Sequence, residues 1–166
     1  MREKEKIIMS AWTVTDSNGM THNIECKVKA FSGPQIQVDT NTYRVKSSNW
    51  FVNLIDYTVD FPGANCHVVM IGKNARLAVN GTYQDDGSAY EPVTSIPAWL
   101  WVLVAISVIG GWFFGGILCC AIGAAFGTLY ITAGLQKNNK KVIGAFIGFL
   151  VIAALFFGLQ LMLMGM

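Results

Sequence analysis

Residues 97–135 have the sequence PAWLWVLVAISVIGGWFFGGILCCAIGAAFGTLYITAGL and contain no charged side chain. A second uncharged run covers residues 142–166. A membrane-crossing helix needs about 20 apolar residues, so the second run has the length of one crossing and the first has room for two short ones. We therefore predict a transmembrane helical domain over residues 95–166.

The composition divides the chain at the same place. The sequence is 53% hydrophobic, and its mean hydropathy is +0.45. The last acidic residue is Glu91, and the only charges after Pro97 are Lys137, Lys140 and Lys141. The net charge of +2 therefore comes from the lysines between the apolar runs. No basic stripe interleaved with aromatic residues is present, which argues against a nucleic-acid partner.

A glycine pair marks the expected break in the longer apolar run. Gly110-Gly111 lies near its middle, and glycine adopts a tight turn without steric cost. The predicted membrane segments are then 97–109, 111–136 and 141–163. The first segment would rise only about 20 Å against a hydrocarbon core of about 30 Å. One long tilted helix in place of the first two segments, giving two crossings, is the alternative.

Aromatic and basic residues predict the depth and orientation of these segments. Trp99 and Trp101 lie at the start of the first segment, where indole rings favour the membrane interface. Lys137, Lys140 and Lys141 form the only charged loop among the segments, so that loop is expected in the cytoplasm. Three crossings then place residues before 95 in the cytoplasm and the C-terminus outside, whereas two crossings place those residues outside.

The N-terminal residues favour three crossings. The only apolar run there is Ile7-Ile8-Met9, which is too short for a secretory signal. Moving the front half of the chain across the membrane would require such a signal. We therefore predict a multi-pass protein of the cell membrane with its front domain in the cytoplasm.

Small residues recur at every fourth position of the second segment. This glycine-zipper pattern predicts a helix-packing ridge consisting of Gly111, Gly115, Cys119, Gly123 and Gly127, continued in the third segment by Gly144 and Gly148. Four-residue spacing places these positions on one helix face, and small side chains let helix backbones approach closely in lipid. The packing lies within one chain or between copies, and we expect a mixture of both that ends in a homo-oligomer.

The front half of the chain has the alternation of β-strands. Ile24, Cys26 and Val28 alternate with Glu25, Lys27 and Lys29, which predicts a strand with one buried and one solvated face. Similar alternation recurs around residues 36–38, 43–45 and 55–61, residues 68–71 form an apolar run, and Leu77 and Val79 begin another strand. We predict an N-terminal tail over residues 1–9 and a small antiparallel β-sandwich or barrel over residues 10–94.

Turn residues lie between these strands. Asn18-Gly19 and Asn80-Gly81 favour tight hairpins in which both central residues have positive φ. Ser32-Gly33-Pro34, Pro62-Gly63 and Asp86-Gly87 mark further turns. The fold class is therefore a β domain followed by a bundle of three, or alternatively two, transmembrane helices.

Part of the front half resembles a known family. The stretch from Trp12 through Asn18-Gly19 to residues 36–39, and the stretch from Tyr57 to Gly81, resemble the Fas apoptotic inhibitory molecule (FAIM) family. The resemblance covers at most residues 11–92. It implies a small cytosolic all-β fold without known catalytic residues.

Candidate metal ligands are separated by strand geometry. His22 and Cys26 would lie on one face, but about 13 Å apart along an extended strand. Adjacent Cys66 and His67 would point to opposite faces. We therefore expect no metal and no cofactor, and we predict that Cys26 and Cys66 are reduced thiols in the core.

The remaining reactive residues have plain structural interpretations. Cys119-Cys120 are predicted to be small packing residues, because a thiol in hydrocarbon is unreactive. Asp85-Asp86-Gly87 lacks the spaced ligands of a calcium loop and is predicted to be a turn. No catalytic triad, phosphate loop or carboxylate pair is visible, so we do not expect an enzyme.

These observations lead to one functional prediction and one alternative. The prediction is a non-enzymatic membrane protein that self-associates and displays a cytoplasmic β domain to a protein or ligand. Its partners would be the lipid bilayer, further copies of the chain and an unidentified protein. The alternative is an oligomeric ion or small-solute channel, with the β domain as a vestibule or gate.

Overall fold

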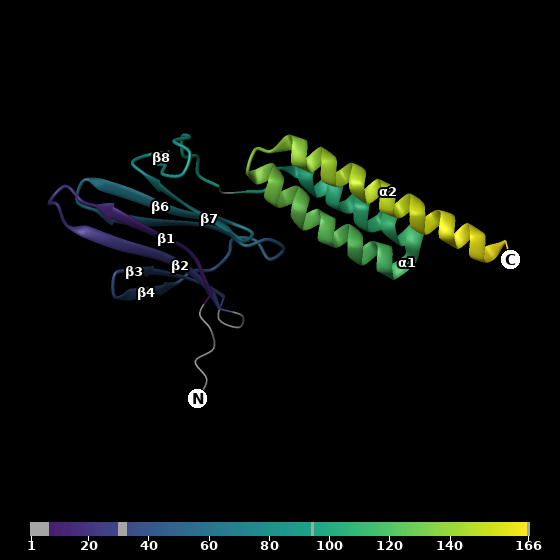
Figure 1. Cartoon of the computed structure of the whole chain (residues 1–166), viewed down its shortest axis with the longest axis horizontal. Coiled ribbons are helices and arrows are strands. Elements are labelled where there is room, and N and C mark those ends of the chain that lie inside the picture. Colours follow the sequence, from purple (N-terminus) through teal and green to yellow (C-terminus); the bar gives the residue numbers. More distant parts are fainter. Residues whose placement is uncertain (1–6, 30–32, 94, 166) are drawn as a thin grey trace, which may run out of the picture. The chain divides into compact units, whose positions relative to one another are not determined.

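The computed structural model describes residues 7–29, 33–93 and 95–165. The predicted tail residues 1–6, the strand position Ala30 and the turn position Ser32 lie outside the described residues. The chain forms two compact units, Met1–Thr94 and Ser95–Met166. The first unit contains β-strands and the second contains helices (Figure 1).

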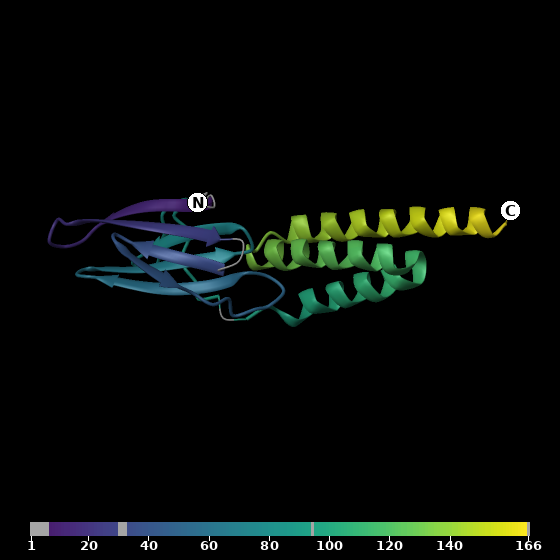
Figure 2. The ribbon, with the colours of Figure 1, turned by 90° about the horizontal axis from the view of Figure 1, so that it is seen from below.

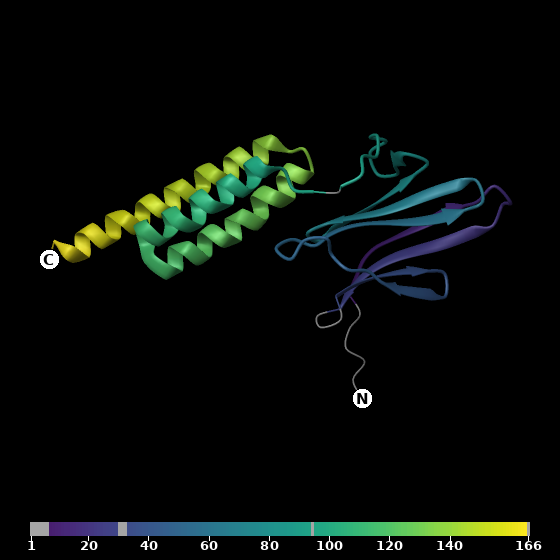
Figure 3. The same cartoon turned by 180° about the vertical axis from the view of Figure 1, so that it is seen from behind.

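The β domain consists of two four-stranded antiparallel sheets. The first sheet contains β1 (Ile7–Thr15), β2 (Thr21–Lys29), β3 (Gly33–Val38) and β4 (Asn41–Arg44) in that order, and the second contains β5 (Leu54–Phe61), β6 (Ala64–Ile71), β7 (Asn74–Val79) and β8 (Thr82–Tyr83). Within each sheet every strand pairs with the next strand in the sequence, so each sheet is a meander. Figure 3 shows the two sheets from behind.

The core lies between the two sheets. The first sheet contributes Ile24, Cys26 and Ile36, and the second contributes Val68 and Met70, all of them at most 1% exposed. The Sγ atom of Cys26 lies 3.9 Å from the Sδ atom of Met70 across the interface. Burying an apolar side chain of this size stabilises the fold by about 1.5–3 kcal/mol. The alternation predicted around Ile24 and Cys26 is confirmed.

The hairpins confirm one turn prediction and correct another. At Asn80-Gly81 both central residues have positive φ, 49° and 81°, as a tight two-residue hairpin requires. At Asn18-Gly19 only Gly19 has positive φ, 79°, because the loop is longer than two residues. The glycine is therefore required in both turns, whereas Asn18 is not in the left-handed region.

Two predictions about the first sheet are wrong. Strand β1 begins at Ile7, which pairs with Val28, so the last three residues of the predicted tail belong to the sheet. Lys27 is only 6% exposed, although the alternation predicts a solvated side chain. Its ammonium group pairs with Glu25 and donates a hydrogen bond to Gln37 at 2.6 Å, which compensates for its burial.

The helical unit contains α1 (Ala98–Leu135) and α2 (Asn139–Met164). Helix α1 reverses direction at Gly115 and Gly116, whose backbone angles are not helical. Its two arms, residues 98–114 and 117–135, run antiparallel in close contact. A Cβ atom added to Gly123 of the second arm would lie 2.3 Å from the carbonyl oxygen of Ser107 in the first arm. Figure 2 shows the arms side by side, with α2 along the second arm.

The reversal lies five residues beyond the position that the sequence predicts. Gly110 and Gly111 are helical, and the predicted turn there is wrong. Gly111 is instead a packing residue, since an added Cβ atom would lie 2.6 Å from the carbonyl oxygen of Cys119. The shift lengthens the first arm to about 26 Å at about 1.5 Å per residue, closer to the thickness of a bilayer core.

A tight turn connects the second arm to α2. Lys137 has a φ of 56°, and the amide groups of Lys137 and Asn138 donate hydrogen bonds to the carbonyls of Gly134 at 3.0 Å and Ala133 at 2.9 Å. This is the Schellman pattern of a helix end. The Asn138 side chain then caps α2 by accepting the amide of Lys141 at 3.1 Å. The turn returns α2 along the second arm.

We predict that alanine at Gly116 destabilises the helical unit, whereas alanine at Gly110 does not. Gly116 has φ 64° and ψ −152°, a conformation nearly restricted to glycine, and strain of this kind costs about 1–3 kcal/mol. No atom lies within 4 Å of an added Cβ atom there, so the loss would be conformational. Thermal unfolding in detergent measures it, and Gly110→Ala is the control. Equal stability of the two variants would contradict a reversal at Gly116.

Candidate functional site

A cavity of about 490 Å³ opens at the edge of the sandwich between β4 and β5. Its walls include Arg44, Lys46, Ser48, Asp56 and Val93. The two basic side chains are exposed, and neither forms an ion pair or hydrogen bond with any described residue. Two unpaired cations at one opening favour an anionic ligand.

The loop that follows β4 is held by its own side chains. The hydroxyl of Ser47 accepts the amide of Leu54 at 2.9 Å, and the Asn49 side chain accepts the amide of Phe51 at 2.8 Å. Side-chain bonds of this kind fix a loop without regular secondary structure. The loop nevertheless presents Trp50 to solvent, with 86% of its surface exposed. It is therefore an ordered loop with an indole at its tip.

Asp56 fixes the segment through which the chain leaves the β domain, residues 90–93, which we call the exit segment. Its carboxylate accepts the hydroxyl of Tyr90 at 2.7 Å and the amide of Val93 at 3.2 Å. The Tyr90 ring also stacks on His67, with centroids 4.2 Å apart, and the Nδ1 atom of His67 lies 3.3 Å from Asp56. Burial, together with the hydrogen bond to Asp56, raises the pKa of Tyr90. The exit segment is thus attached to the outer face of the second sheet at the beginning of β5.

A second histidine lies at the opposite end of the sandwich. The Nδ1 atom of His22 lies 2.9 Å from Asp39, and its Nε2 atom lies 3.7 Å from the buried carboxylate of Asp16. The ring stacks on Phe61 of the other sheet, with centroids 4.0 Å apart. The aromatic stack therefore connects the two sheets, whereas the charged groups of the cluster all come from the first sheet and its turns.

The charges of this cluster stabilise one another. The hydrogen bond to Asp39 raises the pKa of His22, and the negative charges of Asp39 and Asp16 raise it further. Burial acts in the opposite direction but is outweighed. Burial acts to raise the pKa of Asp16, but the amides of Met20 and Asn18 and the charge of His22 outweigh it and lower that pKa. His22 is consequently more basic than an exposed histidine.

The structure separates the four residues that strand geometry sets aside as metal ligands. Cys26 and Cys66 lie in the core, whereas His22 and His67 lie at the two sites above. No group of three or more His, Cys, Asp or Glu side chains within residues 7–29, 33–93 and 95–165 has the arrangement of a metal site. All four cysteines are free thiols, and burial raises the pKa of Cys26 to about 11.

The Asp85-Asp86 pair binds an arginine of its own domain. Arg76 donates to Asp85 at 2.7 Å and lies 2.6 Å from Asp86, and its guanidinium group lies 3.8 Å from the centre of the Tyr83 ring. Asp86 also accepts the Ser88 amide at 2.9 Å, which closes the turn. Both carboxylates therefore have a structural role in the β8 region.

Most of the predicted packing ridge lies inside the helical unit. Gly111, Cys119, Gly123 and Gly127 are buried, and Gly115 lies at the reversal of α1. In α2, Gly148 has an ordinary contact with Phe126, and Gly144 is exposed with no atom within 4 Å of an added Cβ atom. The close contacts of the ridge are thus made within one chain, and Gly144 is the member that faces outward.

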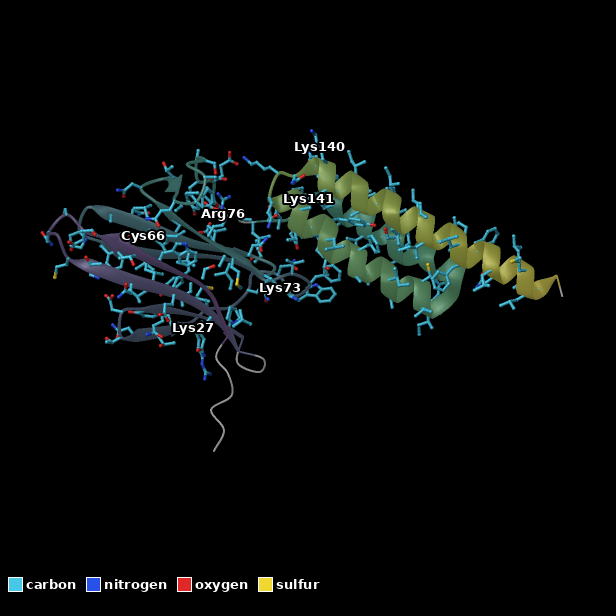
Figure 4. The ribbon with its side chains drawn as sticks, in the orientation of Figure 1. Lys27, Cys66, Lys73, Arg76, Lys140 and Lys141 are labelled. Atoms are coloured by element: carbon cyan, nitrogen blue, oxygen red, sulfur yellow. The ribbon has the colours of Figure 1, made fainter. Side chains whose placement is uncertain are left out.

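The predicted interfacial residues lie at one end of the helical unit. A Cβ atom on Gly134 would lie 2.6 Å from the Leu100 side chain, so the start of the first arm lies beside the end of the second. Trp99 and Trp101 flank Leu100, and Lys137 follows Gly134 by three residues. Figure 4 labels the remaining anchors, Lys140 and Lys141, at the turn between α1 and α2.

Comparison with known proteins identifies no relative. No family model, curated protein or solved structure matches the chain. The resemblance to the FAIM family therefore stays a prediction.

Sequence reasoning missed the acidic residues that organise both histidine sites and the basic residues at the cavity. One of them had a local signal. Asp16 lies two residues before Asn18, the spacing at which an aspartate accepts a turn amide, and that bond is present at 2.9 Å. Asp56 and Arg44 had no such signal, because their partners and neighbours come from distant strands.

We predict that the contribution of His22 to stability declines as the pH rises. A raised pKa in the folded state means that the stabilisation is complete below the ordinary value of 6.5 and is lost as the pH passes the folded pKa. Urea unfolding of wild type and His22→Gln from mildly acidic to mildly basic pH measures this contribution. The difference between their free energies of unfolding should become smaller as the pH rises. The same substitution in an Asp39→Asn background is the control, with a smaller dependence on pH. A difference constant with pH would contradict the prediction.

We predict that isoleucine at Gly123 disrupts the helical unit and isoleucine at Gly144 does not. Overpacking costs about 1–3 kcal/mol, and more where backbone blocks the new side chain, as the Ser107 carbonyl does at Gly123. Gly144 offers open space on the same chain. Thermal unfolding in detergent measures the stability of both variants. A greater loss for Gly144→Ile would show that packing between copies dominates.

Proposed function

We propose that this chain is an integral membrane protein whose three helical arms cross the bilayer and hold the β domain in the cytoplasm as a binding module. One observation carries the proposal. Helices α1 and α2 are long and apolar enough to cross a membrane, yet only 22% and 17% of their most apolar windows are buried. The core helix of a soluble protein would be mostly buried, so the exposure favours lipid as the surrounding medium.

The residues on the outside of the helices support this proposal. Phe113, Ile117 and Leu155 are 75%, 78% and 69% exposed. A soluble domain rarely exposes so many large apolar side chains side by side. Moving apolar surface from water into the protein interior is favourable by about 25 cal/mol for each Å². In hydrocarbon the same surfaces are solvated by lipid.

The arrangement of the anchors supports the proposed orientation. Trp99 and the three lysines lie at the same end of the helical unit, which matches an interface with both an aromatic belt and positive charge. Positive charge favours the cytoplasmic side, and the chain enters α1 at this end. The arms rise about 26, 29 and 39 Å, so the longest, α2, would tilt or extend beyond a core of about 30 Å.

Self-association is part of the proposal. Gly144 is exposed on α2 with no atom within 4 Å of an added Cβ atom, and a glycine at such a position would let another helix backbone approach closely in a membrane. The backbones of the two α1 arms touch at Gly123 and Ser107, which closes the space between those arms. Conduction would therefore need a path between copies, and the channel alternative gains no support from these contacts.

The proposed role of the β domain is binding without catalysis. The cavity beside Arg44 and Lys46 is the candidate site for a ligand. The buried thiols and the paired carboxylates have structural partners, which supports a binding role over a catalytic one. The resemblance to the FAIM family is in agreement with a non-catalytic cytosolic domain.

Protease accessibility tests the topology. Trypsin should leave the β domain intact in whole cells and cleave it in permeabilised cells, because Lys46 and Lys73 are exposed. A peptide tag fused after Met166 should be accessible from outside, since three crossings put that end on the other side. The protein should stay in the membrane fraction at alkaline pH. Cleavage of the β domain from outside would overturn the three-crossing orientation.

A further inference from the structure

We propose that the end of the β domain nearest the exit segment docks on the negatively charged surface of the bilayer. We call this surface the Trp50 tip and define it as Arg44, Lys46, Trp50 and Lys73. In this arrangement the indole inserts among the lipid headgroups and the basic side chains face lipid phosphates. The inference rests on the proposed function, because it requires α1 to be in the membrane.

The members of the Trp50 tip lie at one end of the sandwich. The amide of Gly72 donates a hydrogen bond to the carbonyl of Asn53 at 2.7 Å, which ties the β6–β7 turn to the loop that carries Trp50. Lys73 lies in this turn and is labelled in Figure 4. Arg44 ends β4, immediately before the same loop.

The chain leaves the β domain at this same end. Val93 is held by Asp56 at the beginning of β5, and Val93 and Ser48 line one cavity. The extended chain spans at most about 3.3–3.6 Å per residue, so the step from Val93 to Ala98 covers at most about 17 Å. Because Ala98 begins the first crossing in the proposed topology, this tether keeps the Trp50 tip within reach of the headgroups.

The chemistry of the Trp50 tip fits an anionic interface. An indole favours the headgroup region because it joins an apolar body to one N–H donor, and lysine and arginine are attracted to anionic leaflets. Trp50 is 86% exposed on a loop already fixed by Ser47 and Asn49, so insertion requires little further ordering. The three basic side chains have no ion pair with a described residue. Glu91 is the acidic residue on the exit segment.

The opposite end of the sandwich has the opposite charge. The exposed acidic side chains there are Asp39, which pairs with His22, and Asp60 near the end of β5, while Asp16 is buried in the first turn. The amide of Ser17 donates to the carbonyl of Pro62 at 2.9 Å, which places these turns together. An anionic surface would repel this end and attract the other, so the charge distribution favours one orientation of the domain.

The test uses the full chain in nanodiscs of phosphatidylcholine, with and without phosphatidylglycerol. The fluorescence emission of Trp50 is obtained by subtracting the emission of the Trp50→Phe variant from that of the wild type. Phosphatidylglycerol should reduce its quenching by acrylamide and increase its quenching by lipids with a nitroxide on the headgroup. Lys46→Gln and Lys73→Gln should each lower the ratio of docked to undocked domain about fivefold. Salt at about 1 M should weaken docking, because the Debye length falls to about 3 Å.

A moved tryptophan provides the matched control. Met20→Trp in the Trp50→Phe background places an indole at the acidic end, where Met20 is 59% exposed. Acrylamide should quench it equally in both lipids. Equal access of acrylamide to Trp50 in both lipids would overturn the docking proposal, as would protection that persists in Lys46→Gln/Lys73→Gln. A chain that fails to enter the discs contradicts membrane insertion itself, whereas an inserted chain with freely quenched Trp50 contradicts only the docking.

Discussion

The contact between the two α1 arms is the constraint on which the helical unit depends. At Gly123 and Gly111 the backbone of one arm touches the backbone of the other, at distances that no side chain tolerates. Hydrophobic attraction is absent between helices in lipid, so such contacts supply dispersion energy that larger residues would prevent. The contact also sets the register that brings Leu100 beside Gly134, and with it the tryptophans beside the lysine turn. One packing contact thus determines which side chains lie together at this end of the helical unit.

Much of the fold was predictable from local patterns. The alternation around Ile24 identifies the core face of β2, and the uncharged run after Pro97 identifies the helical unit, because both depend on neighbours in the sequence. The reversal at Gly116 was not predictable from glycine pairs alone. Gly110-Gly111 and Gly115-Gly116 are equivalent as turn formers, and only the packing of Gly111 against the opposite arm decides between them. The burial of Lys27 was not predictable from local patterns either, because it depends on Glu25 and Gln37 rather than on the alternation along the strand.

The candidate sites were harder to foresee than the fold. The cavity joins Arg44 of one sheet to Asp56 of the other and to Val93 beyond both, so no sequence window contains it. The histidines were visible as residues, but their acidic partners come from separate turns and strands. What the sequence did contain is the charge imbalance along the domain: the aspartates of the turns at one end and the basic residues at the other. That imbalance becomes informative only when the meander topology shows which turns share an end.

The meander topology also has a consequence for the synthesis of the protein. Within each sheet every strand after the first pairs with the strand made just before it, so the β domain needs no segment from the helical part of the chain to complete its sheets. Sheets built from consecutive hairpins have short loops to close, which favours fast folding, and N-terminal domains generally fold first during translation. In the proposed topology, the two sheets can therefore be complete on the ribosome before the first apolar arm reaches the membrane. A domain already folded at that moment is a poor substrate for translocation, so on this proposal the order of its strands would help to keep it on the side where it was made.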